Sequence, residues 1–424
     1  MSIYDKASLI QIPSGYKASK LYSVIPNSGA GDFTVTGDPE GEATRVNSQG
    51  LIENVSANVP RLDYPFIDGE VQDCPHLLLE PQRTNNTAYS EDFSSWGDVG
   101  VTITSSAIVS PDGTTNASKL VSTANNWRKS SSFSGSAGVT YTVSIYAKLD
   151  TSTSTTTTRL EVYNGAGSLA ADYNLLNETI SNSGFTSVFI EPVEDDWYRI
   201  GGTYTAGGTN NILYIYPSAG YGTAGTMYFW GAQQEAGSYP TSYIKTIGLS
   251  VTRLVDSSHL FNHSLFTDYP FTVYAKAEAK ATPNDIFSLV DNTSTTEYLL
   301  FQLSSSTQVA VIRRNPTTSD ADYYAFSYSI GDTLKVAISY ISATSYKLYI
   351  NGTQVGNVTS GSSLPFAYPD ILLGQQRVAL DTGRRNPIDE FMVFNEALSD
   401  SELETLTSYS SFNSMATALG YKII

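Results

Sequence analysis

The feature that most constrains the fold is a succession of short β-like runs, separated by turn residues, along most of the chain. Residues 141–148 and 197–204 are typical, because they concentrate the β-branched and aromatic residues that strands favour. Asn351 and Gly352 lie between two alternating runs, which is a strong signal for a two-residue hairpin turn. The runs recur at intervals typical of β-sandwiches, so the chain is predicted to be all-β.

The chain of 424 residues is too long for one ordinary hydrophobic core. About eight runs in residues 87–247 predict a jelly roll of two packed sheets, and residues 248–408 predict a second sandwich. Residues 1–86 contain few long apolar runs, which predicts an N-terminal segment extended against other chains or a particle. A small independent β domain is the alternative for that segment. Residues 409–424 form a short C-terminal tail.

Charge and cysteine content restrict the partners that we expect. The net charge is −17, which argues against a nucleic-acid partner and against an anionic membrane surface. Cys74 is the only cysteine, so no disulfide can form within one chain. The N-terminal residues lack the pattern of a signal peptide, and no apolar run is long enough for a membrane span. We therefore expect synthesis in the cytoplasm without membrane insertion.

Signatures of catalysis are weak in this sequence. His259 and His263 are four residues apart, but the glutamate that a zinc-protease motif requires does not follow His259. A nucleophile elbow and a phosphate-binding loop are also missing from the sequence. Paired carboxylates can hydrolyse glycosidic bonds, yet the acidic residues here stand in segments typical of solvated turns. We predict no catalytic residue and no enzymatic activity.

Several motifs resemble a known family of proteins. The segments LLLEPQRTN (77–85), YSEDFSSW (89–96), SPDGTTNASKLV (110–121) and QQEAGSYPTSYI (233–244), followed by VTR (251–253), resemble carbohydrate-binding-type modules of bacteriophage head-spike and tail-fibre proteins. The order of the motifs in residues 1–86 also resembles the lead segment of such fibres. The first and last of these motifs bracket the predicted jelly roll, and we interpret them as mostly architectural.

The second sandwich resembles another family. The segments YINGTQVG, LLGQQR and IDEFMVFNEALSDSELETL, in that order, resemble the concanavalin A-like (laminin G-type) lectin domain. The last of them contains Ser399 and Glu402 at the spacing of a capping box, which predicts a short helix.

Together the resemblances imply a phage virion appendage, a head fibre or spike or a tail fibre, that displays glycan-binding domains for host attachment. They imply a homo-oligomer, expected to be a trimer, whose N-terminal segment contacts other virion proteins of the capsid or tail. Host surface glycans are the expected ligands. A structural capsid decoration or connector without glycan binding is the alternative, and a glycan-degrading enzyme is a third.

Glycan recognition requires aromatic rings that stack on sugars and planar polar groups that bond hydroxyls. In the predicted jelly roll, Trp127 and Arg128 have this character and are expected in a polar loop, while Trp96, Trp197 and Trp230 are expected in the packed interior. The other predicted sugar-binding residues are Tyr163 and Tyr221, with Tyr214 and Tyr216 as further candidates, and Arg314, Tyr324, Arg377 and Arg385 in the second sandwich.

A structural calcium ion is the one cofactor that the resemblance implies. Related modules hold calcium where the first and last strands meet. Glu91, Asp92 and Glu235 stand on the corresponding segments here, and carboxylates are ligands that calcium prefers.

Overall fold

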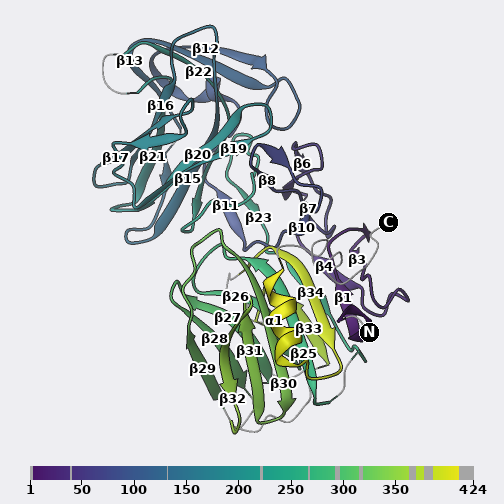
Figure 1. The fold of residues 1–424 in the computed structure, drawn as a ribbon. Coiled ribbons are helices and arrows are strands. Elements are labelled where there is room, and N and C mark those ends of the chain that lie inside the picture. The colour runs from purple at the N-terminus through teal and green to yellow at the C-terminus, as the bar shows by residue number, and fades with distance from the viewer. Residues whose placement is uncertain are drawn as a thin grey trace.

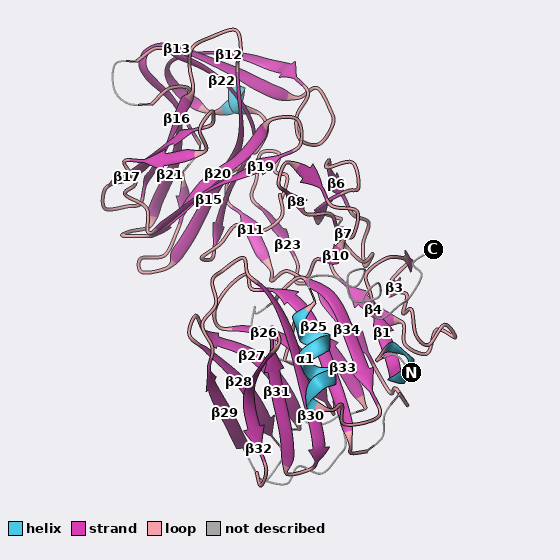
Figure 2. Cartoon of the chain, in the orientation of Figure 1, coloured by secondary structure: helices cyan, strands magenta, loops and turns pink. Residues whose placement is uncertain are grey.

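The computed structural model describes residues 3–38, 41–130, 132–219, 223–265, 268–291, 297–314, 319–361, 369–376 and 385–409. It consists of two β-sandwich lobes with short purple strands of the N-terminal segment beside both (Figure 1). In the described residues, helical structure is limited to α1 (Asp400–Ser408) and the 3-10 turns η1 (Tyr4–Lys6) and η2 (Phe93–Ser95) (Figure 2). The prediction of an all-β protein with jelly-roll and concanavalin A-like architecture is confirmed.

The first lobe is built from strands that all lie within residues 87–247. Its sheet has the order β18 (Thr179–Ser181), β17 (Ser168–Asn174), β16 (Thr157–Tyr163), β21 (Asn210–Tyr216), β13 (Ala117–Lys129), β22 (Gly225–Ala236), β15 (Thr140–Leu149), β20 (Trp197–Thr205) and β19 (Ser187–Val193). At its sides, β12 (Gly97–Ile108) pairs with β13, and β14 (Phe133–Ser134) pairs with β21.

The two ends of this sheet fold over each other. The hydroxyl of Tyr173 in β17 donates to the carbonyl of Gly201 in β20 over 2.8 Å, although these strands are far apart in the sheet order. Leu160 and Leu213 from one half share a buried apolar cluster with Ile145 from the other. The first lobe is therefore a two-layered sandwich with its core between the halves.

Two sheets form the second lobe. One contains β32 (Thr353–Val358), β31 (Ser345–Ile350), β30 (Thr333–Ser342), β25 (Phe271–Glu278), β34 (Ile388–Phe394), β10 (His76–Leu77) and β7 (Leu62–Asp63), with β1 (Ala7–Gln11) also on β34. The other contains β2 (Tyr16–Lys17), β3 (Lys20–Leu21), β4 (Phe33–Thr36), β24 (Ser257–Leu260), β33 (Asp370–Leu373), β26 (Asn284–Val290), β27 (Tyr298–Ser305), β28 (Gln308–Arg314) and β29 (Ser319–Ala325).

Residues 1–86, which we name the lead segment, belong to the second lobe. β1 pairs with β34 from Ala7 to Gln11, and β4 pairs with β24. Phe33 is fully buried and packs edge-on against Phe391, with 6.1 Å between ring centroids. Most of the described lead segment has no sheet of its own and pairs with or packs on the two lobes, while its contact with other chains or a particle stays a prediction. Strands β1, β2, β3, β4, β7 and β10 belong to the two sheets of the second lobe, so this part of the lead segment folds onto the chain itself.

The lead segment also covers one face of the first lobe. The hairpin of β5 (Thr44–Val46) and β6 (Ile52–Asn54) places Ile52 in a buried cluster with Trp197 and Trp230. A second small hairpin is formed by β8 (Phe66–Ile67) and β9 (Glu70–Val71). Trp197 and Trp230 are buried as predicted, but under this hairpin and outside the core between the two layers. Trp96 packs against Phe93 at 5.0 Å, which confirms its predicted packing role.

Two local predictions in the second lobe are confirmed. Asn351 and Gly352 both have positive φ, 47° and 81°, as a tight hairpin turn between β31 and β32 requires. Before α1, the backbone N–H of Ser399 donates to the Glu402 carboxylate over 2.9 Å, so the capping box forms. The described residues contain no helix with the length and apolar character that crossing a bilayer requires. The tail after Tyr409 lies outside the described residues.

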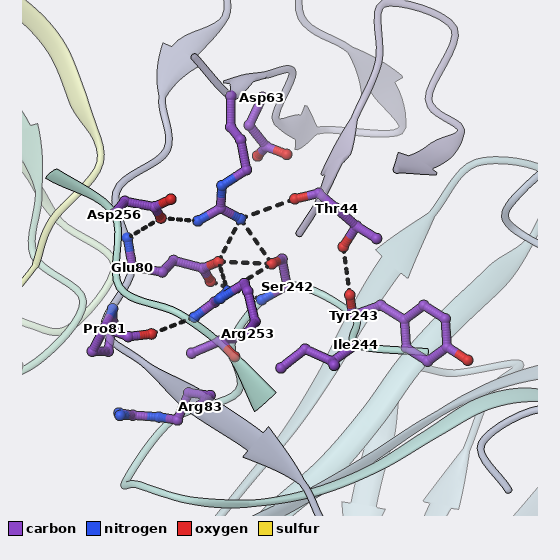
Figure 3. A network of polar contacts seen from close by, with 12 residues as sticks. Thr44, Asp63, Glu80, Pro81, Arg83, Ser242, Tyr243, Ile244, Arg253 and Asp256 are labelled. Carbon is purple, nitrogen blue, oxygen red and sulfur yellow. Dashed lines mark hydrogen bonds and ion pairs between the residues drawn. The ribbon is translucent and has the colours of Figure 1, made fainter. Parts of the chain in front are cut away.

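A buried ionic network joins the three parts of the chain (Figure 3). Glu80 of the lead segment accepts from Arg61 Nη1 over 2.7 Å and contacts Arg253 Nη1. Ser242 of the first lobe donates to Glu80 from its backbone N–H and from its hydroxyl, both over 2.7 Å. Arg61 also contacts Asp256 of the second lobe. Burial alone would raise the pKa of Glu80, but the charges of Arg253 and Arg61 hold it well below its usual range.

This network explains the motifs that bracket the first lobe. Residues of LLLEPQRTN form β11 (Arg83–Asn85), which pairs antiparallel with β23 (Val251–Arg253), the VTR motif. The segment that enters the first lobe (β11) and the segment that follows it (β23) therefore run side by side as a two-stranded antiparallel ribbon. The prediction that these segments are architectural agrees with their contacts.

His76 gives the lead segment a pH-dependent contact. Its Nε2 lies 3.1 Å from the Asp63 carboxylate on the neighbouring strand. Burial alone would lower the pKa of His76, but the Asp63 carboxylate outweighs it and raises the pKa above its usual value. The stabilisation is therefore fully present below about pH 6.5 and is lost as the pH rises through the raised value. We expect His76→Gln to lower the unfolding temperature more at pH 6 than at pH 9, as scanning calorimetry can measure. An equal loss at both values would contradict the assignment.

Candidate functional site

The strongest candidate site is the outer face of β16, β17 and β21 in the first lobe. Leu160 and Leu213 point into the core, so strand alternation places their neighbours on the opposite face. Backbone pairing aligns Arg159 with Asp172 and Tyr216, and Glu161 with Tyr214. Six residues define this surface, which we name the tyrosine face: Arg159, Glu161, Tyr163, Asp172, Tyr214 and Tyr216.

The polar groups of the tyrosine face are held by one another. Arg159 binds Asp172 through two nitrogens, with Nε–Oδ1 at 2.6 Å and Nη2–Oδ2 at 3.1 Å. Asn182 donates to the same carboxylate over 2.6 Å. The Tyr216 hydroxyl donates to Glu161 over 2.9 Å. Because each planar group has a fixed partner, the face is organised before any ligand arrives.

The electrostatics of the face favour binding over proton transfer. Burial would raise the pKa of Asp172, but hydrogen bonds from Arg159 and Asn182 outweigh it and lower that pKa. A glycosidase acid requires the opposite shift, so Asp172 is suited to accept hydrogen bonds as a carboxylate. Burial and the nearby Glu161 charge raise the pKa of Tyr214, which keeps its hydroxyl protonated at neutral pH.

The rings of Tyr163 and Tyr214 are half-buried, so part of each remains accessible. Glu161, Asp172 and Tyr216 are themselves at most 9% exposed, so they hold the face in place, and Arg159 with the two rings remains partly accessible. Accessible rings beside a fixed guanidinium can stack on the apolar face of a sugar and bond its hydroxyl groups.

The structure brings together three of the tyrosines that the sequence indicated: Tyr163, Tyr214 and Tyr216. Four residues of this site were not among the predicted ones: Arg159, Glu161, Asp172 and Asn182. The signal for two of them was present, because Arg159 and Glu161 alternate with Leu160 and Val162 in the same run as Tyr163. Asp172 and Asn182 depend on pairing between strands, which the sequence does not reveal.

Trp127 and Arg128 were expected in a polar loop, but they lie in strand β13. Their backbones pair with Val99 and Asp98 of β12, and Arg128 also pairs with Ile215 of β21. Pairing on both sides outweighs the polar character of the segment, because strand preference depends on neighbours more than on composition. The side chains of Trp127 and Arg128, and the whole of Tyr221 and Arg377, lie outside the described residues.

The remaining candidates of the second lobe do not form one site. Arg314 is exposed at the end of β28. Tyr324 pairs with Val309 near the start of β28, and the five residue steps from Val309 to Arg314 span roughly 16 Å at the usual rise per residue. The Tyr324 hydroxyl lies 2.6 Å from that of Tyr346. Arg385 is only 3% exposed and donates to the Asp256 carbonyl over 2.9 Å, so it packs at the junction of the lobes and not on a rim.

Glu91, Asp92 and Glu235 are held by separate protein groups. Asp92 accepts hydrogen bonds from the backbone and side chain of Ser94. Glu91 accepts from Tyr243 over 3.0 Å and from Lys245 over 2.8 Å. Glu235 is fully buried and accepts from the backbone and hydroxyl of Thr241. Within the described part of the chain, these carboxylates do not join in a group of three or more His, Cys, Asp or Glu side chains, and the calcium ion stays a prediction.

Residues 255–404 match the family described as the concanavalin A-like lectin/glucanases superfamily, so the second lobe has a concanavalin A-like fold. A comparison with curated proteins found no match.

Solved structures with similar folds include carbohydrate-binding and toxin domains. The CBM40 module of Ruminococcus gnavus IT-sialidase, bound to α2,3-sialyllactose, shares 15% identity over 34% of this chain and 84% of its own, with a TM-score of 0.30. NanB sialidase from Streptococcus pneumoniae shares 22% identity over 34% of this chain and 25% of its own, also at 0.30. The binding domain of botulinum neurotoxin DC, in complex with rat synaptotagmin II, shares 16% sequence identity with this chain. The similarity covers 38% of this chain and 40% of that domain's chain, with a TM-score of 0.29. The chain thus spans a quarter of the sialidase, and likeness at this level carries no inference about ligands.

Proposed function

We propose that this protein is a glycan-binding appendage of a bacteriophage virion, with the tyrosine face as its sugar-binding surface. The observation that carries the glycan-binding part is the set of accessible rings, Tyr163 and Tyr214, beside polar groups already fixed by Arg159–Asp172 and Tyr216–Glu161 bonds. The lectin-type fold of the second lobe supports the same class of function. No catalytic step is part of this proposal.

The virion role rests on the resemblance of the bracketing motifs to phage fibre modules. A net charge of −17 supports display at high density, because acidic surfaces repel one another and remain solvated. In a homo-oligomer such as a trimer, several weak sites on one particle would act together, since linked sites raise the effective affinity for a glycan-covered surface. Mass spectrometry of purified particles tests this role, and absence of the chain from them would contradict it.

The glycan-binding part is tested by screening the full-length protein on a glycan array. Selective binding to at least one glycan class is the expected result. The matched variants are Tyr214→Ala, which removes a ring of the tyrosine face, and Tyr323→Ala, which removes an exposed ring of the second lobe. Loss of signal in the first variant alone supports the assignment.

One observation favours a second function, that of a connector or capsid decoration without glycan binding. The lead segment contributes strands to the second lobe, packs on the first and joins both through buried ion pairs, which makes a stiff two-lobed unit. If no glycan binds in the array and particles lacking the protein lose stability, this second function replaces the first.

A further inference from the structure

A cavity of about 400 Å³ lies where the lead segment and the two lobes meet. We name it the junction cavity. It is separate from the tyrosine face, and its size lies in the range of pockets that hold small ligands, which often form between domains. All three parts of the chain supply its walls, including Asp63 and His76, Phe189, Arg199 and Tyr239, and Lys280.

Arg199 is the central group in the wall of the junction cavity. It lies in β20 next to the core residue Ile200, so its side chain is on the outer face of that strand. It is only 8% exposed, donates from Nη2 to the Ser144 hydroxyl over 3.0 Å, and lies 5.5 Å from the Tyr146 ring centroid. Among the described residues, no carboxylate is within ion-pair distance of Arg199, and its Nε has no hydrogen-bond partner.

The other charged groups in the walls already have partners of their own. Lys280 binds Glu278 at 2.6 Å, and Arg45 binds Glu53 at 2.8 Å. Glu80 lies between Arg61 and Arg253 in the buried network.

The walls also contain two further acidic residues, Asp63 and Glu191. Asp63 lies beside His76, 3.1 Å from its ring nitrogen. Glu191 is the strand neighbour of Arg199, but it is exposed, and water screens its charge. Among the described residues, Arg199 is therefore a buried guanidinium without a carboxylate in direct ion-pair contact, and its Nε has no hydrogen-bond partner. Burial alone would lower the pKa of Arg199, but Tyr146 and the more distant charges of Glu191, Glu235 and Glu80 outweigh it and raise that pKa, so the guanidinium stays charged and can receive an anion.

We propose that the junction cavity binds a small carboxylate-bearing sugar, with the carboxylate on Arg199. A guanidinium prefers a planar carboxylate, because two of its N–H groups can bond both oxygens. The walls also contain the hydroxyl of Ser238 and those of Ser187 and Thr203, which lie 2.8 Å from each other and keep further acceptor capacity for sugar hydroxyls. The half-buried ring of Phe189 offers a surface against which a sugar ring can stack, whereas the Tyr239 ring already has the Arg83 guanidinium 5.5 Å from its centroid. A terminal uronic acid combines these features.

Binding at this position has a consequence for the whole molecule. A ligand in the junction cavity touches the lead segment and both lobes at once. Because it binds only the folded arrangement, it raises the unfolding temperature increasingly as its free concentration exceeds the dissociation constant. This proposal does not depend on glycan binding at the tyrosine face.

The experiment titrates full-length protein with D-glucuronate by calorimetry and follows the unfolding temperature. D-glucose is the neutral counterpart, and acetate supplies a carboxylate without a sugar ring. Arg199→Gln removes the charge. Ser187→Trp fills the cavity from an exposed position and keeps Arg199 intact. Lys148→Gln, on neighbouring β15 and paired with Asp195 outside the cavity walls, is the matched control for loss of one positive charge.

The expected result is saturable glucuronate binding that weakens at least tenfold in Arg199→Gln and in Ser187→Trp. Lys148→Gln and Tyr214→Ala should bind as the natural protein does, which separates this site from the tyrosine face. No saturable binding at about 10 mM glucuronate would overturn the proposal. Equal binding of acetate would overturn the sugar assignment, and unchanged binding in both cavity variants would overturn the location.

Discussion

Replacement of Glu80 by alanine is expected to destabilise the protein by about 3–5 kcal/mol, because it leaves the buried charges of Arg61 and Arg253 without their shared carboxylate. Arg61 is 2% exposed and Arg253 is fully buried, so water cannot replace the missing partner. Scanning calorimetry can measure the loss. Because all four tryptophans lie in residues 87–247, their fluorescence reports in addition whether the first lobe responds.

The matched control for Glu80→Ala is Glu53→Ala. Glu53 also pairs with an arginine, Arg45, but its side chain is 39% exposed, so its loss should cost at most about 1 kcal/mol. Similar small losses in both variants would show that the network does not hold the three parts together.

The second large effect is expected from Phe33→Ala in the lead segment. Phe33 is fully buried against Phe391 and shares the core of the second lobe, so its truncation should cost about 3–5 kcal/mol. The unfolding transition of the second lobe should move to lower temperature in calorimetry. A lead segment that only lay against another chain would leave that transition unchanged in the isolated monomer.

Tyr22→Ala serves as the control for Phe33→Ala. Tyr22 belongs to the same segment but is 41% exposed, and exposed substitutions usually change stability by less than about 0.5 kcal/mol. If Tyr22→Ala and Phe33→Ala have equal effects, the lead segment is not part of the folded core.

The sequence predicted the elements whose signals are local. The Asn351–Gly352 turn, the capping box at Ser399 and the long runs of both sandwiches depend on neighbouring residues, and each is present in the structure. The place of the lead segment was not predictable in this way. Its strands are two to five residues long, and β1 pairs with β34 at the far end of the chain, so neither periodicity nor turn residues indicate the partner.

The candidate site was predicted only in part, because some of its residues have a local sequence signal and others depend on pairing between strands. Tyr163 was identified by its residue type, and alternation within β16 could have added Arg159 and Glu161. Asp172 joins the site only because β17 pairs with β16 in one register. Arg199 could not be identified as a candidate, because its lack of an anionic partner depends on side-chain positions from separate strands and from the lead segment.

Calorimetric titration with the glycan that the array selects tests the central proposal most directly. We predict that Tyr163→Ala and Tyr214→Ala each weaken binding by about tenfold or more, equivalent to about 1.4 kcal/mol, while Tyr323→Ala leaves the affinity unchanged. Natural affinity in a variant that lacks both Tyr163 and Tyr214 would contradict glycan binding at the tyrosine face.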